Sequence, residues 1–276
     1  MELIKSLQNP LVKYLQKLNR RKFREQEGRF LIEGFRFVEE ALESGWPVDK
    51  VIYSPDLLKS PRGADLLAAA ARENIKTVEV DQKIISALAS TETPQGIMAL
   101  CLTAKWQVSD VTGAPRAGKA KKDVLVVVVD GVGDPGNLGT IIRSADAFGA
   151  DGAILLKGTV DLYNDKTMRS TMGSFFHLPV VSNAGIEELR GLLSEGGFGL
   201  LVGVPEGGVP VDSLDLERPL ALVVGSEAAG PSGELLSLPH EKTTIPMPGR
   251  AESLNAGVAA SIMMYEIVRQ RNSRRQ

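Results

Sequence analysis

The sequence of 276 residues is poor in the side chains that bind metals and form disulfides. It contains one cysteine, Cys101, and two histidines, His177 and His240. A single cysteine excludes an internal disulfide and a cysteine metal cluster, and two histidines argue against a histidine-rich metal site. Cys101 lies in the apolar run GIMALCL, which favours a small core residue over a nucleophile. We therefore expect no metal in the function of this chain.

Long apolar stretches and a strong net charge are also absent. No run approaches the length of a membrane-spanning helix, and the N-terminal MELIKSLQNP lacks the apolar segment of a signal peptide. We therefore expect a cytoplasmic protein. The net charge is -2, and the hydrophobic fraction of 43% and charged fraction of 24% are ordinary for a globular protein.

Positive charge is concentrated at the two ends of the chain. Residues 1–27 carry seven Lys or Arg against three Glu. Four of these seven are Arg20, Arg21, Lys22 and Arg24. The C-terminal tail adds Arg269, Arg271, Arg274 and Arg275. Such clusters can bind phosphate and release its counterions, but charge alone favours a solvated helix face and a frayed tail.

The order of helix and strand signals predicts two domains. Residues 1–103 alternate between them: LVKYLQKLNRRKFREQE, FRFVEEALESG and ADLLAAAARENI indicate helices, whereas VDKVIYS, KTVEV and GIMALCL indicate strands. This is typical of a small α/β domain. Residues 104–122 mix Gly, Pro, Ala and Lys without a period and indicate a linker.

Residues 123–276 form the second predicted domain. VLVVVV, AILL, FGLLVGV and LALVVG are short, continuous apolar runs separated by helical stretches. Strands buried on both faces of a parallel sheet have this pattern. We predict an α/β domain with a mainly parallel sheet.

The first of these strands runs into DGVGDPGNLGTIIRSADAFGA, where Gly131, Gly133 and Gly136 spell G-x-G-x-x-G. A dinucleotide site would need an acidic residue at the end of the next strand. That strand, AILLKG, ends in Lys157, which disfavours a nicotinamide-dependent oxidoreductase. The following helix has Asn137 at its start, as a possible N-cap, and Arg143 at the edge of its apolar face.

Two later segments carry polar residues beside glycine-rich backbone. LALVVGSEAAG places Glu227 between Gly225 and Gly230. In TIPMPGRAESLNAGVAASIMMYEIV, Ser253 or Asn255 can cap a long helix. Gly257 inside that helix costs about 1 kcal/mol relative to Ala, so we predict that the helix packs closely against another backbone.

Together the three segments resemble the motifs of the SpoU (TrmH-like) family of RNA ribose methyltransferases in the SPOUT superfamily. The first motif is matched by Asn137, Gly139, Arg143, Ser144 and Ala145, and the second by Gly225, Glu227 and Gly230. The third is matched by Ile245, Pro246, Met247, Gly249, Ser253, Leu254 and Asn255, with Ala256-Gly257 departing from the pair usual after it. The N-terminal GRFLIEGFRFVEEAL is similar to the family's substrate-binding domain of ribosomal-protein-like fold.

This resemblance implies a fold, a cofactor and an assembly. The fold is α/β: a C-terminal parallel-sheet SPOUT domain with a trefoil knot, preceded by a small α/β ribosomal-protein-like RNA-binding domain. The implied cofactor is S-adenosylmethionine, held largely by backbone groups. The residues expected around it are Val224, Gly225, Gly230, Ile245, Met247 and Leu254. The implied assembly is a homodimer formed through the C-terminal domain, with active sites built from both subunits.

The resemblance also implies methyl transfer to a ribose 2′-hydroxyl. Arg143 is the central catalytic residue, with Asn137, Glu227, Ser253 and Asn255 beside it. A guanidinium holds its proton too tightly to act as a base. We therefore expect Arg143 to bind the phosphate beside the target ribose and to polarise the hydroxyl, while Glu227 orients Arg143.

RNA recognition is expected from the N-terminal domain through Arg20, Arg21, Lys22 and Arg24. Ribosomal RNA of the 23S type is the favoured substrate, because many members that carry such a domain act on ribosomal RNA. A tRNA substrate, a role in resistance to a ribosome-targeting antibiotic, and a non-catalytic RNA-binding assembly factor are the alternatives that the sequence leaves open.

Overall fold

The computed structural model describes residues 3–111 and 120–273, and the chain divides into two compact units, Met1–Ala104 and Lys105–Gln276. Of the predicted linker, residues 112–119 lie outside the described residues. The part before them includes the 3-10 helix η2 (Val108–Val111), and Val111 is buried in the core of the second unit. No helix in the described parts of the chain is long and apolar enough to cross a membrane.

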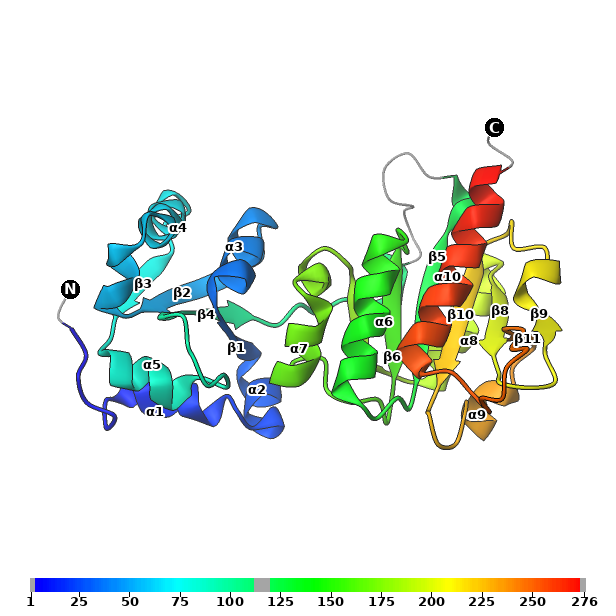
Figure 1. Cartoon of the computed structure of the whole chain (residues 1–276), viewed down its shortest axis with the longest axis horizontal. Helices are drawn as coiled ribbons and strands as arrows, with labels where there is room; N and C mark the ends of the chain where they lie inside the picture. The colour runs from blue at the N-terminus through cyan, green and yellow to red at the C-terminus, as the bar shows by residue number, and fades with distance from the viewer. Residues whose placement is uncertain (1–2, 112–119, 274–276) are drawn as a thin grey trace. The chain divides into compact units, whose positions relative to one another are not determined.

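The first unit is built on a four-stranded mixed sheet. Its strands lie in the order β1 (Arg29–Glu33), β4 (Ile97–Leu102), β2 (Val48–Tyr53) and β3 (Lys76–Glu79), and only β2 and β3 are parallel. Helices α1 (Pro10–Lys17) and α5 (Gln82–Leu88) lie on one side of the sheet in Figure 1, and α3 (Phe35–Glu43) and α4 (Pro61–Arg72) lie on the other. The short η1 (Pro55–Lys59) precedes α4. The predicted small α/β domain is confirmed, although β1 and α5 were not predicted.

The basic N-terminal helix is two helices. The sequence predicts one helix, but α1 ends at Lys17 and α2 (Arg21–Glu27) begins after a break. Nη1 of Arg24 donates a hydrogen bond of 2.6 Å to the carbonyl oxygen of Leu18, which a continuous helix would pair with a backbone amide. Arg24 is only 7% exposed. Its predicted role in binding RNA is therefore wrong, because this guanidinium lies inside the fold.

The second unit contains a seven-stranded parallel sheet. Its order is β7 (Val180–Ala184), β6 (Gly152–Leu156), β5 (Leu125–Asp130), β10 (Leu220–Gly225), β8 (Gly199–Gly203), β11 (Glu241–Thr244) and β9 (Val209–Pro210). Every neighbouring pair is parallel. The apolar runs of β5 and β6 are buried along their whole length, as expected for strands covered on both faces. The predicted parallel sheet is confirmed.

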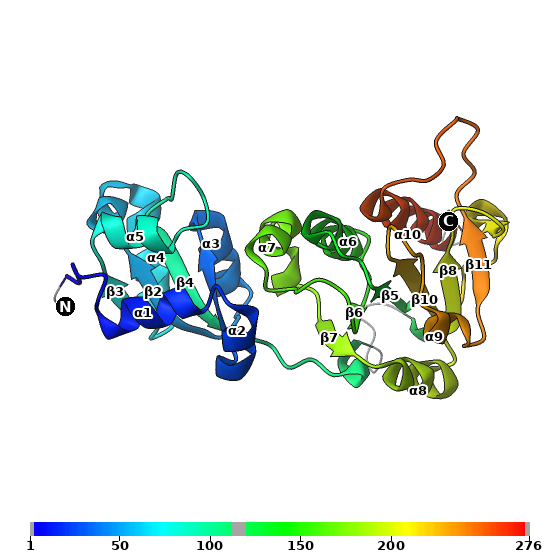
Figure 2. The same ribbon diagram turned by 90° about the horizontal axis from the view of Figure 1, so that it is seen from below.

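Helices cover both faces of this sheet. Figure 2 shows α6 (Pro135–Ala147), α7 (Asp165–Thr171) and α10 (Ala256–Ser273) on one face, and α8 (Ile186–Gly196) and α9 (Gly233–Leu236) on the other. Three further 3-10 helices are η3 (Lys121–Asp123), η4 (Ser174–Phe176) and η5 (Val211–Ser213). The strands that carry the three motifs end at one edge of the sheet, where parallel α/β folds bind ligands.

Helices α6 and α10 pack closely along one seam. A Cβ on Gly257 would lie 2.9 Å from Cβ of Thr140, so α10 fits against α6 only without a side chain there. One turn further on, the hydroxyls of Ser144 and Ser261 are 2.7 Å apart. The predicted close approach is confirmed, but the neighbour of Gly257 is a side chain and not a backbone.

Candidate active site

The start of α6 sets the direction of Asn137. Asp134 is the N-cap, and its carboxylate accepts a hydrogen bond of 2.9 Å from the backbone N–H of Asn137, while Pro135 occupies the first turn. That N–H, together with the ammonium of Lys166, lowers the pKa of Asp134. The suggested N-cap role of Asn137 is therefore wrong, and its side chain is available for other contacts.

Three segments far apart in the sequence meet at the side chain of Asn137. Its Nδ2 donates to Oε1 of Glu227 across 2.6 Å, and its Oδ1 accepts from Nδ2 of Asn255 across 2.7 Å. The backbone N–H of Gly133 makes a longer contact of 3.4 Å with the other Glu227 oxygen. The β5–α6 loop, the β10 loop and the start of α10 are thus joined by one chain of side-chain hydrogen bonds.

Asn255 is held by the helix that it begins. Its Oδ1 accepts from the backbone N–H groups of Gly257 at 2.9 Å and Val258 at 3.2 Å, which makes it the N-cap of α10. Ser253, the other suggested cap, makes no hydrogen bond to any described residue. Because the oxygen of Asn255 is occupied by the helix, its NH₂ group must point to Asn137.

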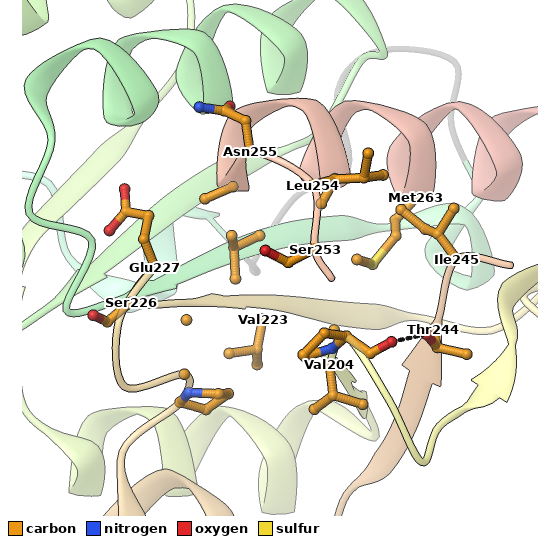
Figure 3. A pocket seen from close by; sticks show the side chains of 18 of the residues that line it. Val204, Val223, Ser226, Glu227, Thr244, Ile245, Ser253, Leu254, Asn255 and Met263 are labelled. Carbon is orange, nitrogen blue, oxygen red and sulfur yellow. Dashed lines mark hydrogen bonds between the residues drawn. The ribbon is translucent and has the colours of Figure 1, made fainter. Parts of the chain in front are cut away.

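A cavity of about 590 Å³ opens beside this hydrogen-bonded chain. It is lined by the loops after β8 and β10, the segment between β11 and α10, and the first turns of α10. All six residues expected around the cofactor line it: Val224, Gly225, Gly230, Ile245, Met247 and Leu254. Figure 3 shows Glu227 and Asn255 at one end of this cavity and the apolar Ile245 and Met263 at the other.

The wall made by the β10 loop is a tight turn. Ser226 and Gly230 exchange backbone hydrogen bonds of 3.1 and 2.8 Å, and Gly230 has a φ of +68°. A Cβ on Gly225 would lie 2.4 Å from the nitrogen of Pro231, so only glycine fits there. The buried Asp130 at the end of β5 accepts a bond of 2.6 Å from the N–H of Ser232 and fixes the far end of the loop.

The size and chemistry of the cavity suit an amphipathic cofactor such as S-adenosylmethionine. The volume lies within the range of small-molecule sites, and apolar side chains surround backbone groups at the turn. Among the described residues that line it, Glu227 is the only one with an acidic or basic side chain. Within the described parts of the chain, no three His, Cys, Asp or Glu side chains gather into a metal site.

Arg143 lies on α6 but away from this cavity. It is exposed, and it makes no hydrogen bond or ion pair with any described residue. Gly139, one turn earlier on the same face, packs against Ser170 of α7, whereas Asn137 and Ser144 face α10. The expectation that Glu227 orients Arg143 is therefore not met within one chain: the contacts of Glu227 are Asn137 and Gly133.

Comparison with known proteins identifies the family. The profile of the SpoU rRNA Methylase family matches residues 124–265, and that of the MRM3-like substrate binding domain matches residues 9–99. The chain is 37% identical over 269 residues to the 23S rRNA (guanosine(2553)-2′-O)-methyltransferase RlmP of Bacillus subtilis (strain 168), covering 97% of this chain and 99% of RlmP. The chain belongs to the SpoU rRNA methylase family.

Solved structures of this family have the same fold over nearly the whole chain. The AdoMet-bound rRNA methyltransferase from Sinorhizobium meliloti is 32% identical with a TM-score of 0.85 and covers 98% of both chains. The SpoU methyltransferase AviRb from Streptomyces viridochromogenes, in complex with the cofactor AdoMet, is 31% identical with a TM-score of 0.84 and covers 96% of this chain and 100% of AviRb. The predicted family, SPOUT-type α/β fold, enzyme class and S-adenosylmethionine cofactor are confirmed.

Several residues that build this site were not predicted from the sequence. Asp134 caps α6, Gly133 contacts Glu227, and Asp130 anchors the β10 loop through Ser232. The Asp-Pro pair at 134–135 is a recognisable helix start and could have been read as one. Asp130 carried no local signal, because its partner lies 102 residues further along the chain.

Proposed function

We propose that this chain transfers a methyl group from S-adenosylmethionine to a ribose 2′-hydroxyl of 23S ribosomal RNA. The observation that carries the proposal is the joining of Asn137, Glu227 and Asn255 at the mouth of an apolar cavity. The Bacillus subtilis relative acts on 23S rRNA, as does the 23S rRNA (uridine(2479)-2′-O)-methyltransferase of Streptomyces viridochromogenes, which is 35% identical over 94% of this chain and 88% of its own. Such a substrate implies a cytoplasmic location.

The cofactor would lie against backbone of the second and third motifs. We assign its contacts to Val224, Gly225, Gly230, Ile245, Met247 and Leu254. When bound, S-adenosylmethionine supplies a methyl group on a positively charged sulfonium that a nucleophilic oxygen can displace. The protein must then place the ribose oxygen in line with that methyl group and help to remove the hydroxyl proton.

We infer that Arg143 acts in the active site of a second copy of the chain. Arg143 is exposed on α6 and does not line the cavity of its own chain. A guanidinium binds phosphate in a forked geometry and stays charged. Arg143 of the second copy would hold the phosphate beside the target ribose and polarise its hydroxyl. Ser253, at the rim of the cavity, is available to bond the same ribose.

An apolar stripe on α10 supports this dimer. Val258, Ile262 and Tyr265 follow one face of the helix and are 45%, 37% and 56% exposed. The opposite face, including Ala260, Met263 and Ile267, is buried in the unit. Residues 256–265 of α10 are thus mostly apolar on both faces, and a helical segment of this kind is normally covered on all faces. We propose that a second copy covers this stripe.

RNA binding in the first unit is assigned to Arg20, Arg21 and Lys22. All three are exposed at the junction of α1 and α2, and Arg21 also pairs with Glu25. Replacing Arg20 and Lys22 by Gln should weaken RNA binding and lower the slope of log affinity against log salt by about one for each lost phosphate contact.

The family's trefoil knot is part of the proposal as well, with residues 245–255 as the threaded segment between β11 and α10.

The test of the proposed function offers the purified protein labelled S-adenosylmethionine and three separate RNA pools. These are 23S rRNA, 16S rRNA and tRNA, each from a strain that lacks the protein. Label in alkali-resistant dinucleotides of 23S rRNA alone supports the proposal, because a 2′-O-methyl group blocks alkaline cleavage at its own position. Label confined to tRNA or 16S rRNA would overturn the choice of substrate, and no label in any pool would favour a binding protein.

A further inference from the structure

The position of Glu227 in the cavity lining bears on which group accepts the proton of the ribose hydroxyl. Among the described residues that line the cavity, Glu227 is the only one with an acidic or basic side chain. The polar side chains around it are hydroxyls and amides, which are very weak bases. Arg143 keeps its proton, and it does not line the cavity of its own chain. Glu227 is therefore the one candidate for the base of the reaction among the described residues that line the cavity.

The hydrogen bonds around Glu227 have a fixed direction. The cap of α10 occupies Oδ1 of Asn255, so its Nδ2 donates to Asn137. The oxygen of Asn137 is thereby an acceptor, and its Nδ2 donates to Glu227. The positions of the oxygen and the nitrogen in an Asn side chain are assigned from such hydrogen-bond partners. Asn137 and Gly133 thus both present N–H donors to Glu227, and each of its two oxygens accepts one hydrogen bond.

The N–H groups of Asn137 and Gly133 leave lone pairs on the Glu227 oxygens that can accept a further proton. An ionised carboxylate has about four lone-pair directions, and Asn137 and Gly133 take one on each oxygen. The side chain is exposed at the mouth of the cavity, so a substrate hydroxyl can reach it. A carboxylate takes the proton of a substrate hydroxyl in the same way in protein kinases.

We propose that Glu227 is the proton acceptor of the methyl transfer, a role that rests on the function proposed above. The 2′-oxygen forms a bond to the methyl carbon with its own electron pair, while the carbon–sulfur bond breaks and its pair stays on sulfur. The O–H bond breaks, and the proton moves to a Glu227 oxygen. The carboxylic acid later releases this proton to water. Asn137 and Asn255 act as positioning residues for this carboxylate.

Other charged groups lie near the hydrogen-bonded side chains of Asn137, Glu227 and Asn255 and affect how the rate depends on pH. Asp134 caps the same helix as Asn137 and pairs with Lys166 of α7. Arg250 and Glu252 lie on the exposed segment before Asn255, and Arg143 of a second copy is expected nearby. The pH dependence must therefore be compared between variants and not assigned from the wild type alone.

The test measures single-turnover methyl transfer to 23S rRNA with S-adenosylmethionine and RNA both saturating. Glu227→Gln keeps the shape of the side chain but cannot take the proton, and we expect its rate to fall at least 100-fold. Affinity for S-adenosylmethionine, measured by calorimetry, should stay within about threefold. Glu234→Gln, on the exposed first turn of α9, is the matched control and should keep the wild-type rate.

Chemical rescue separates a base from a structural role. In Glu227→Ala, added formate or acetate should raise the rate when wild type and variant are compared at the same pH. A wild-type rate in Glu227→Gln, or a slow Glu227→Ala that no carboxylate restores, overturns the proposal. The proposed function fails separately, if the wild-type protein itself methylates no ribose in 23S rRNA.

Discussion

Asn255 caps α10 with its side-chain oxygen, and its Nδ2 donates a hydrogen bond of 2.7 Å to Oδ1 of Asn137. One residue thus begins a helix and fixes the direction of a hydrogen-bond chain that ends on Glu227. The two tasks can be separated, because Asp caps a helix as well as Asn does but has no N–H to donate.

Asn255→Asp should keep the fold and lose activity. The cap of α10 remains, so the melting temperature should stay within about 2 °C of wild type. An oxygen of the new carboxylate would then face the side-chain oxygen of Asn137, and turning Asn137 over would move the conflict to Glu227. We expect methyl transfer to fall about 10- to 100-fold. Asn255→Ala should lose the cap as well, at a further cost of about 1 kcal/mol of stability. Full activity in Asn255→Asp would show that the direction of the chain does not matter.

Gly225→Ala should damage the cofactor wall. Its new Cβ would lie 2.4 Å from the nitrogen of Pro231 and 2.5 Å from the carbonyl carbon of Gly230, both backbone atoms that cannot rotate away. We expect a loss of about 1–3 kcal/mol in the free energy of unfolding and at least tenfold weaker binding of S-adenosylmethionine by calorimetry. Gly233→Ala is the control, because no atom lies within 4 Å of its added Cβ. Equal affinity in the two variants would contradict the role given to this turn.

Arg271 should be a stability residue and not an RNA contact. It is 8% exposed, and its guanidinium donates to the backbone carbonyls of Leu216, Asp123, Val124 and Arg218, which ties the end of α10 to the sheet. Arg271→Met should leave these buried carbonyls without that donor and cost about 3 kcal/mol or more. Arg190→Met, on the exposed side of α8, should cost less than about 0.5 kcal/mol. A lower urea midpoint for Arg271→Met, together with unchanged RNA affinity, would support this assignment. An unchanged midpoint would refute it.

Mixing two inactive variants should restore activity if Arg143 acts in a second copy. Arg143→Ala and Glu227→Gln should each be inactive as homodimers. In a mixed dimer, the copy with intact Glu227 meets the copy with intact Arg143, so one of the two sites is complete. After random exchange of subunits we expect about a quarter of the wild-type rate. A mixture that stays inactive while mixed dimers are demonstrated by native mass spectrometry would place Arg143 in the site of its own chain.

Much of this architecture could be predicted from the sequence, because continuous, β-branched apolar runs such as VLVVVV and LALVVG are typical of buried strands. The residues that line the cavity were found through the family resemblance, not through local pattern. Periodicity does not show which residue caps α6, since Asp134 and Asn137 both suit a helix start.

The predictions that were wrong share a physical cause. Each depends on a contact that the local sequence does not show, either between residues distant in the chain or across a break in a helix. Arg24 and Arg271 look like surface charges in the sequence, yet each is buried because its guanidinium satisfies backbone carbonyls. The N-terminal helix breaks where Arg24 folds back on Leu18. Arg274 and Arg275, the rest of the basic tail, lie outside the described residues.

The most direct measurement is mass spectrometry of nucleosides from 23S rRNA after reaction with S-adenosylmethionine that carries a deuterated methyl group. We expect one deuterated 2′-O-methylnucleoside with the wild-type protein, and we expect its rate of formation to fall at least 100-fold with Glu227→Gln. Deuterium on a nucleobase, or no deuterated nucleoside from RNA of a strain that lacks the protein, would contradict it.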